Sequence, residues 1–149
     1  MVEIDISAVL KESIWPEVGL PIIITETDFA YPVKDDVWLN WFPFAYIAFR
    51  RLVQKRIESF ATIGAGSGAD AIGAGFIFKN LKTIVLSDID QRVIPVAVSN
   101  VKKYAPTVTV VGLAGHLCEP LRKNKMQIDV MYENLPNISD AGNIAGRYR

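Results

Sequence analysis

A glycine-rich run that follows a short apolar segment is the feature that most restricts how this chain can fold. Residues 63–71 read IGAGSGADA. This run begins at the last residue of the short apolar segment 60–63 and leads into the small, apolar segment 70–78. Glycines adopt backbone angles that other residues avoid, and they let the main chain approach a ligand closely. The first turn of a helix adds backbone amides and a positive partial charge. The run therefore predicts a strand, a turn and a helix that hold a phosphate, a carboxylate or a nucleotide-like ligand, the alternative being a turn that only permits close packing.

Strand patterns and helix patterns alternate along the rest of the chain. We expect strands over residues 21–27, 60–63, 82–86, 107–111 and 127–132, and helices over 43–57, 70–78, 91–104 and, as a short turn, 117–121. Strands that alternate with helices imply right-handed crossovers and a parallel sheet. The sequence therefore predicts an α/β fold, Rossmann-like, with a mostly parallel sheet and flanking helices.

An aspartate follows the strand pattern 82–86 and gives the glycine-rich run a second partner. Asp88 lies 20 residues beyond Gly68. At this position of a nucleotide-binding α/β unit, an acid accepts hydrogen bonds from ribose hydroxyls. Gly64, Gly66 and Ala69 also satisfy the GxGxxA form of the dinucleotide fingerprint. The two features together fit two kinds of protein, one that binds a dinucleotide and one that binds another adenosine-bearing ligand.

A third segment favours one of these two kinds. Residues 128–137 read IDVMYENLPN, a strand pattern followed by a polar Asn-x-Pro turn. Here the chain resembles the class I S-adenosylmethionine-dependent methyltransferases, nearest the N-methyltransferases that carry an Asn-Pro-Pro-Tyr motif. The segments IGAGSGADA, LSDID, VVGLAGHLCEPL and YENLPN match the family's motifs in order, over about residues 60–138. The sequence departs from the family at Thr62 and His116, where the family has acids.

The resemblance implies S-adenosyl-L-methionine as the cofactor and transfer of its methyl group to an acceptor, a small molecule or a protein. It implies Asn134 as the residue that aligns a nitrogen acceptor. The residues implied to bind the cofactor are Gly64, Ala65, Gly66, Gly68, Asp88, Ile89, Gly115, His116, Leu117 and Asn134. Compared with the family's seven-stranded sheet, the predicted sheet is incomplete.

The same resemblance divides the chain into three parts. Residues 1–59 would be a strand and helix segment that covers the cofactor, residues 60–138 the binding core, and residues 139–149 an irregular tail. A sheet that ends after its fourth strand exposes an edge, so we expect pairing with another copy of the chain or with a further segment.

Two other functions stay open on the sequence alone. One is an NAD(P)-dependent oxidoreductase domain, and the other is a non-catalytic binding or scaffold module that has kept the fold. Because 16 basic residues balance 16 acidic ones, a nucleic-acid partner is not favoured. One cysteine and one histidine leave little material for a zinc site. With no apolar run of about 18 residues and no signal-peptide pattern, we expect a cytoplasmic protein without a membrane partner.

Overall fold

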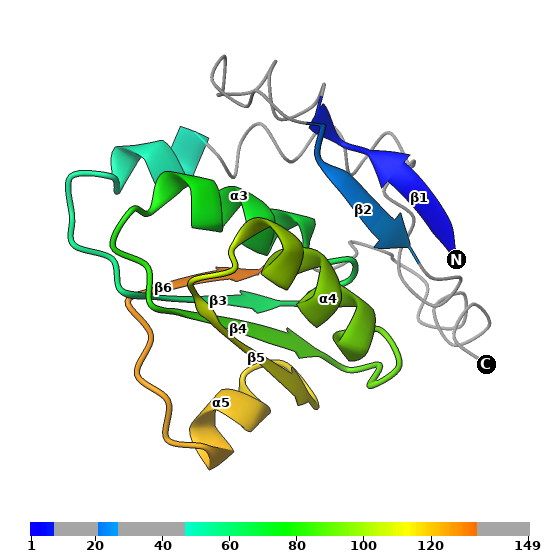
Figure 1. Cartoon of the computed structure of the whole chain (residues 1–149). Coiled ribbons are helices and arrows are strands. Elements are labelled where there is room, and N and C mark those ends of the chain that lie inside the picture. The colour runs from blue at the N-terminus through cyan, green and yellow to red at the C-terminus, as the bar shows by residue number, and fades with distance from the viewer. Residues whose placement is uncertain (8–20, 27–46, 134–149) are drawn as a thin grey trace.

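The computed structural model describes residues 1–7, 21–26 and 47–133. Strands β1 (Val2–Asp5) and β2 (Ile23–Glu26) form an antiparallel ribbon. Strands β3 (Ser59–Ile63), β4 (Thr83–Asp88), β5 (Thr109–Ala114) and β6 (Val130–Glu133) form a parallel sheet, and helices α3 (Ala69–Ile77), α4 (Ile94–Tyr104) and α5 (Glu119–Lys123) connect them (Figure 1). The α/β, Rossmann-like fold predicted from the sequence is confirmed.

The order of the strands sets where a ligand can bind. The sheet reads β5-β4-β3-β6, so the chain winds outward from β3 through α3 to β4 and through α4 to β5, and then returns to place β6 on the other side of β3. The winding direction thus reverses between β3 and β6. In open parallel sheets of this kind, ligands bind at the carboxyl ends of the strands, beside such a switch point.

The core is unequal on the two faces of the sheet. Helices α3 and α4 cover one face, and α5 lies against the other (Figure 1). On the first face, the ring of Phe60 is fully buried and lies 5.3 Å from the ring of Phe49 in an edge-to-face arrangement. On the second face, a small buried cluster joins Ala61 and Val85 to Leu121 of α5. The larger apolar contribution to stability therefore comes from the α3 and α4 side.

The predicted elements differ from the structure mainly at their ends. The strand at 21–27, the helix at 70–78 and all four strands of the parallel sheet are present, although β4 and β5 begin and end up to three residues later than predicted. The helix predicted over 43–57 is wrong beyond residue 51, because the chain turns at 52–54. The apolar spacing continues there because Ile57 enters the core from an extended segment. Strand β1 was not predicted, since its side chains are mostly exposed.

None of the helices in the described ranges combines the length and the apolarity that a membrane crossing needs. The ranges 8–20, 27–46 and 134–149 lie outside the described residues, and the boundaries predicted at 138 and 139 fall within the last of them. The division of the chain at residue 59 also stays a prediction.

We expect the Phe60→Ala variant to lose about 3–5 kcal/mol of unfolding free energy, because truncation leaves a cavity among close-packed rings. Urea denaturation followed by circular dichroism measures this loss. Val53→Ala is the matched control: the Val53 side chain is 48% exposed, and its truncation should change stability by less than about 0.5 kcal/mol. Equal losses in the two variants would contradict this description of the core.

Candidate functional site

The glycine-rich turn between β3 and α3 is held against the end of β4. The amides of Gly64 and Ala65 both donate to the carbonyl of Ser87, at 2.8 and 3.0 Å. The amide of Gly68 donates back to the carbonyl of Ala65 at 2.7 Å. The turn therefore has a defined shape before any ligand binds, and it lies at the carboxyl end of β3.

Asp88 closes the turn from the neighbouring strand. Its Oδ2 accepts a hydrogen bond from the amide of Gly66 at 3.0 Å, and its Oδ1 accepts one from the amide of Asp90, also at 3.0 Å. The carboxylate is partly buried. Because each carboxylate oxygen has two lone pairs, both oxygens keep acceptor capacity for a further donor. The two sequence features that suggested a nucleotide-like ligand thus lie in direct contact.

Glycine is needed at two positions of the turn, 66 and 68, for different structural reasons. Gly66 and Gly68 both have a positive φ, 49° and 83°. A Cβ built on Gly68 would lie 3.0 Å from the carbonyl oxygen of Ala97 and 3.0 Å from a methyl group of Val101, so this glycine lets α3 start close to α4. A Cβ built on Gly66 meets nothing within 4 Å. The turn therefore has open space at position 66, where a ligand could approach the main chain.

The loop after β5 lies at the same edge of the sheet. The amide of Gly115 donates to the carbonyl of Asp88 at 2.8 Å, and the carbonyl of Leu117 accepts from the hydroxyl of Ser87 at 3.4 Å. His116 between them is exposed. Ile89 is 72% exposed at the same edge. The structure thus brings together every predicted binding residue except Asn134, which lies outside the described residues; their contact with a ligand stays a prediction.

Asp70 is a candidate site residue that the sequence analysis did not single out. It lies in the first turn of α3, its side chain is fully buried, and its Oδ1 has no hydrogen-bond partner. Desolvation by this burial raises the pKa of Asp70 to about 7. The hydroxyls of Thr62 and Ser67 are buried without partners as well. An acid placed directly after a glycine run was the available signal, but such an acid is usually a solvated residue that favours the helix start.

Tyr132 faces the same region from β6, where it pairs in register with Thr62. The pKa of Tyr132 is raised, first by burial and then by the negative charge of Asp70. Thr62 and Tyr132 thus lie on β3 and β6, the two strands between which the winding direction of the sheet reverses. Within the described residues, no three His, Cys, Asp or Glu side chains are grouped so that they could hold a metal ion.

A scan of protein-family models and a search of curated proteins found no match to this chain. Among solved structures, the chain is similar to the Δ1-pyrroline-2-carboxylate reductase of Thermococcus litoralis, determined in complex with NADH and L-proline. The TM-score is 0.50 and the sequence identity 15%; the match covers 79% of this chain and 33% of the reductase. This chain thus spans about a third of the length of the protein that it resembles, and at this identity the similarity shows the fold alone.

The comparisons correct the family prediction. The solved structure contains NADH, and neither of the other comparisons supports a methyltransferase, so the resemblance to S-adenosylmethionine-dependent methyltransferases and the cofactor S-adenosyl-L-methionine are wrong. The physical reason is that a glycine-rich turn and an acid after the next strand suit any ligand that carries an adenosine. Only the segment 128–137 favoured methyl transfer, and its Asn-x-Pro turn, residues 134–136, lies outside the described residues.

We expect Gly68→Ala to destabilise the fold more than Gly66→Ala. Both variants place a side chain at positive φ, which costs about 1–2 kcal/mol, but only the first also forces α3 away from α4, at a further cost of about 1–3 kcal/mol. Thermal unfolding of both variants measures the difference. Equal losses would show that the close approach at Gly68 does not constrain the fold.

We expect the Asp70→Asn variant to be more stable than the wild type at pH 8, by more than at pH 5. Because the folded-state pKa of Asp70 is raised from 3.8 to about 7, the unfolded chain ionises first, and stability is lost as the pH rises between these values. The advantage of the variant should grow by roughly 2–3 kcal/mol from pH 5 to pH 8.

Urea denaturation at the two pH values measures this advantage. Asp129→Asn is the control, because hydrogen bonds from the backbone of Glu58 and Ser59 and from the Ser59 hydroxyl lower the pKa of Asp129. Its carboxylate is therefore ionised at both pH values, and the difference between this variant and the wild type should not change. A pH-independent gain for Asp70→Asn would rule out an ionising Asp70.

Proposed function

We propose that this chain carries the dinucleotide-binding unit of an NAD(P)-dependent oxidoreductase and that the unit prefers NAD(H). The observation that carries the proposal is the 3.0 Å hydrogen bond between the Gly66 amide and the Asp88 carboxylate, within a GxGxxA turn. The similarity in fold to a reductase solved with NADH supports it. When bound, the nicotinamide cofactor would supply a hydride to the substrate or take one from it.

The turn and the start of α3 would hold the pyrophosphate. At Gly66 there is open space where a Cβ would lie, and α3 directs the positive end of its dipole toward the turn. Ala69, at the third position of the fingerprint, is fully buried and lets the helix pack closely on the sheet. These features support a pyrophosphate site at the carboxyl end of β3.

Asp88 would accept hydrogen bonds from the hydroxyls of the adenosine ribose. A carboxylate at this place repels the 2′-phosphate of NADP(H), and therefore favours NAD(H). The next basic side chain along the chain, Arg92, does not offset this charge: its guanidinium binds Asp90 through Nε at 2.9 Å and Nη2 at 2.5 Å. Exposed Ile89 and the loop 115–117 would flank the adenine.

The nicotinamide end would reach the switch point between β3 and β6. Ligands in open parallel sheets bind there because the loops on the two sides separate. Buried Thr62 and Asp70 and partly buried Tyr132 lie next to this switch point. A carboxyl with a pKa of about 7 is largely uncharged below neutral pH, so Asp70 would add little repulsion to a bound pyrophosphate there.

Isothermal titration of the full chain with NADH, NADPH and S-adenosylmethionine tests the proposal. We expect NADH to bind tightest. Asp88→Asn should weaken NADH binding about 10- to 100-fold, because a charge-assisted hydrogen bond contributes roughly 1.5–3 kcal/mol, and it should reduce the preference for NADH over NADPH.

Asp129→Asn is the matched control for this experiment. Asp129 also accepts hydrogen bonds from two backbone amides, those of Glu58 and Ser59, but at the amino end of β3. Its substitution should leave NADH affinity unchanged. Absence of NADH binding, or tighter binding of S-adenosylmethionine, would overturn the proposal.

A further inference from the structure

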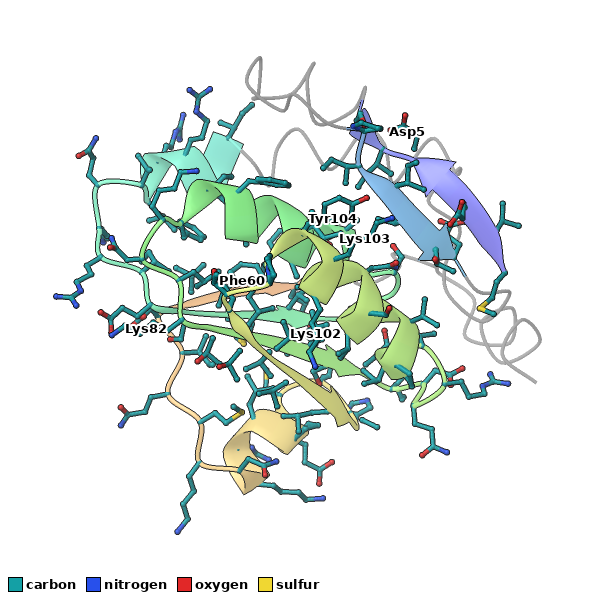
Figure 2. All side chains as sticks on the ribbon, in the orientation of Figure 1. Asp5, Phe60, Lys82, Lys102, Lys103 and Tyr104 are labelled. Atoms are coloured by element: carbon teal, nitrogen blue, oxygen red, sulfur yellow. The ribbon has the colours of Figure 1, made fainter. Side chains whose placement is uncertain are left out.

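The amino-terminal ribbon is fastened to α4 by Tyr104 and Asn100, which lie one helical turn apart, and by Lys103, whose Nζ donates to the carbonyl of Ile23 at 3.3 Å. The amide of Ile23 donates to the hydroxyl of Tyr104 at 2.6 Å, and this hydroxyl donates to the carbonyl of Ile23 at 2.8 Å. The amide of Thr25 donates to Oδ1 of Asn100 at 2.9 Å, and Nδ2 of Asn100 donates to the carbonyl of Thr25 at 2.8 Å. Figure 2 shows Tyr104 on the side of α4 that faces the ribbon.

The spacing on the two elements matches. Residues i and i+2 of a strand lie about 6.6 Å apart, and residues i and i+4 of a helix rise about 6 Å. Helix α4 thus satisfies the backbone groups of Ile23 and Thr25 on the edge of β2 that faces away from β1. Side chains of α4 thus make the hydrogen bonds that a third strand would otherwise make with this edge of β2.

Asn100 also reaches the glycine-rich turn. Its Nδ2 donates a second hydrogen bond, 2.8 Å long, to the carbonyl of Ser67, and the side chain is 4% exposed. The same peptide unit carries the amide of Gly68, which donates to Ala65. Asn100 therefore holds the plane of the peptide that joins the turn to α3. Tyr104 makes no such contact with the turn among the described residues.

We propose that Asn100 is a positioning residue for the bound dinucleotide and that it couples the amino-terminal ribbon to the cofactor site. This inference rests on the proposed function. By fixing the Ser67 carbonyl, Asn100 keeps the Gly68 amide on the Ala65 carbonyl and so preserves the shape of the turn against which a pyrophosphate would bind. Because the same amide group binds Thr25, ordering of the ribbon and binding of the cofactor favour each other, and this coupling is reciprocal.

The experiment compares Asn100→Ala with Tyr104→Phe in the full chain. Both variants remove hydrogen bonds between α4 and β2, so both should lower thermal stability, but only Asn100→Ala also releases the turn. We expect Asn100→Ala to weaken NADH binding about tenfold or more, the effect of losing roughly one buried hydrogen bond, and Tyr104→Phe to change it less than about twofold. Equal effects of the two variants on NADH affinity would overturn the proposal.

Hydrogen exchange of backbone amides gives a readout that needs no variant. In the wild type, NADH should slow exchange at the Thr25 amide, although Thr25 is distant from the turn in sequence. Unchanged exchange at Thr25 in the presence of bound NADH would also overturn the coupling. This measurement keeps the proposal testable even if Asn100→Ala does not fold.

Exchange without ligand separates this inference from the proposed function. In Asn100→Ala the amides of Gly66 and Gly68 should exchange faster than in the wild type, whereas in Tyr104→Phe they should not. If the wild type binds no NADH but shows this pattern, the proposed function is wrong while the role of Asn100 in the turn stands. If the pattern is absent, Asn100 does not position the turn.

Discussion

The hydrogen bond from the Gly66 amide to the Asp88 carboxylate is the contact on which the site depends. It joins the turn after β3 to the end of β4, and the pairing of Gly64 and Ala65 with the Ser87 carbonyl lies directly beside it. Parallel pairing of β3 with β4 brings these groups to one edge of the sheet. A ligand that binds here meets a main chain and a carboxylate already in place, which lowers the ordering cost of binding.

Holding the turn open has a structural cost that the rest of the molecule offsets. Three glycines of the turn have positive φ, and Thr62, Ser67 and Asp70 each leave a polar atom buried without a partner. Unsatisfied buried groups destabilise a fold, by about 1–3 kcal/mol each. Close packing of Phe49, Phe60 and Phe78 under α3 offsets part of this cost. The ring packing that stabilises the fold thus lies beneath the turn, whereas the positive φ angles and the unpartnered polar atoms lie in the turn and next to it.

The sequence predicted those parts that depend on short-range patterns. The strand, turn and helix around Gly66 are local, and Asp88 follows the next strand at a spacing that the βαβ unit fixes. The identity of the ligand could not be predicted in the same way, because a glycine-rich turn and an acid serve S-adenosylmethionine and NADH equally well. Thr62 and His116, which stand where methyltransferases have acids, were the residues that pointed away from that family.

Asp70 and Asn100 could not be found in the sequence for a different reason. The burial of Asp70 depends on α3 packing against the sheet, and the contacts of Asn100 join residues 33 and 75 positions apart. On the sequence, an asparagine in a helix pattern is an ordinary surface residue. In the fold, its single amide group satisfies the edge of β2 and the carbonyl of Ser67 together, so a ribbon far from the glycine run in sequence becomes part of what shapes it. Such long-range polar contacts follow no sequence period, and only the three-dimensional structure reveals them.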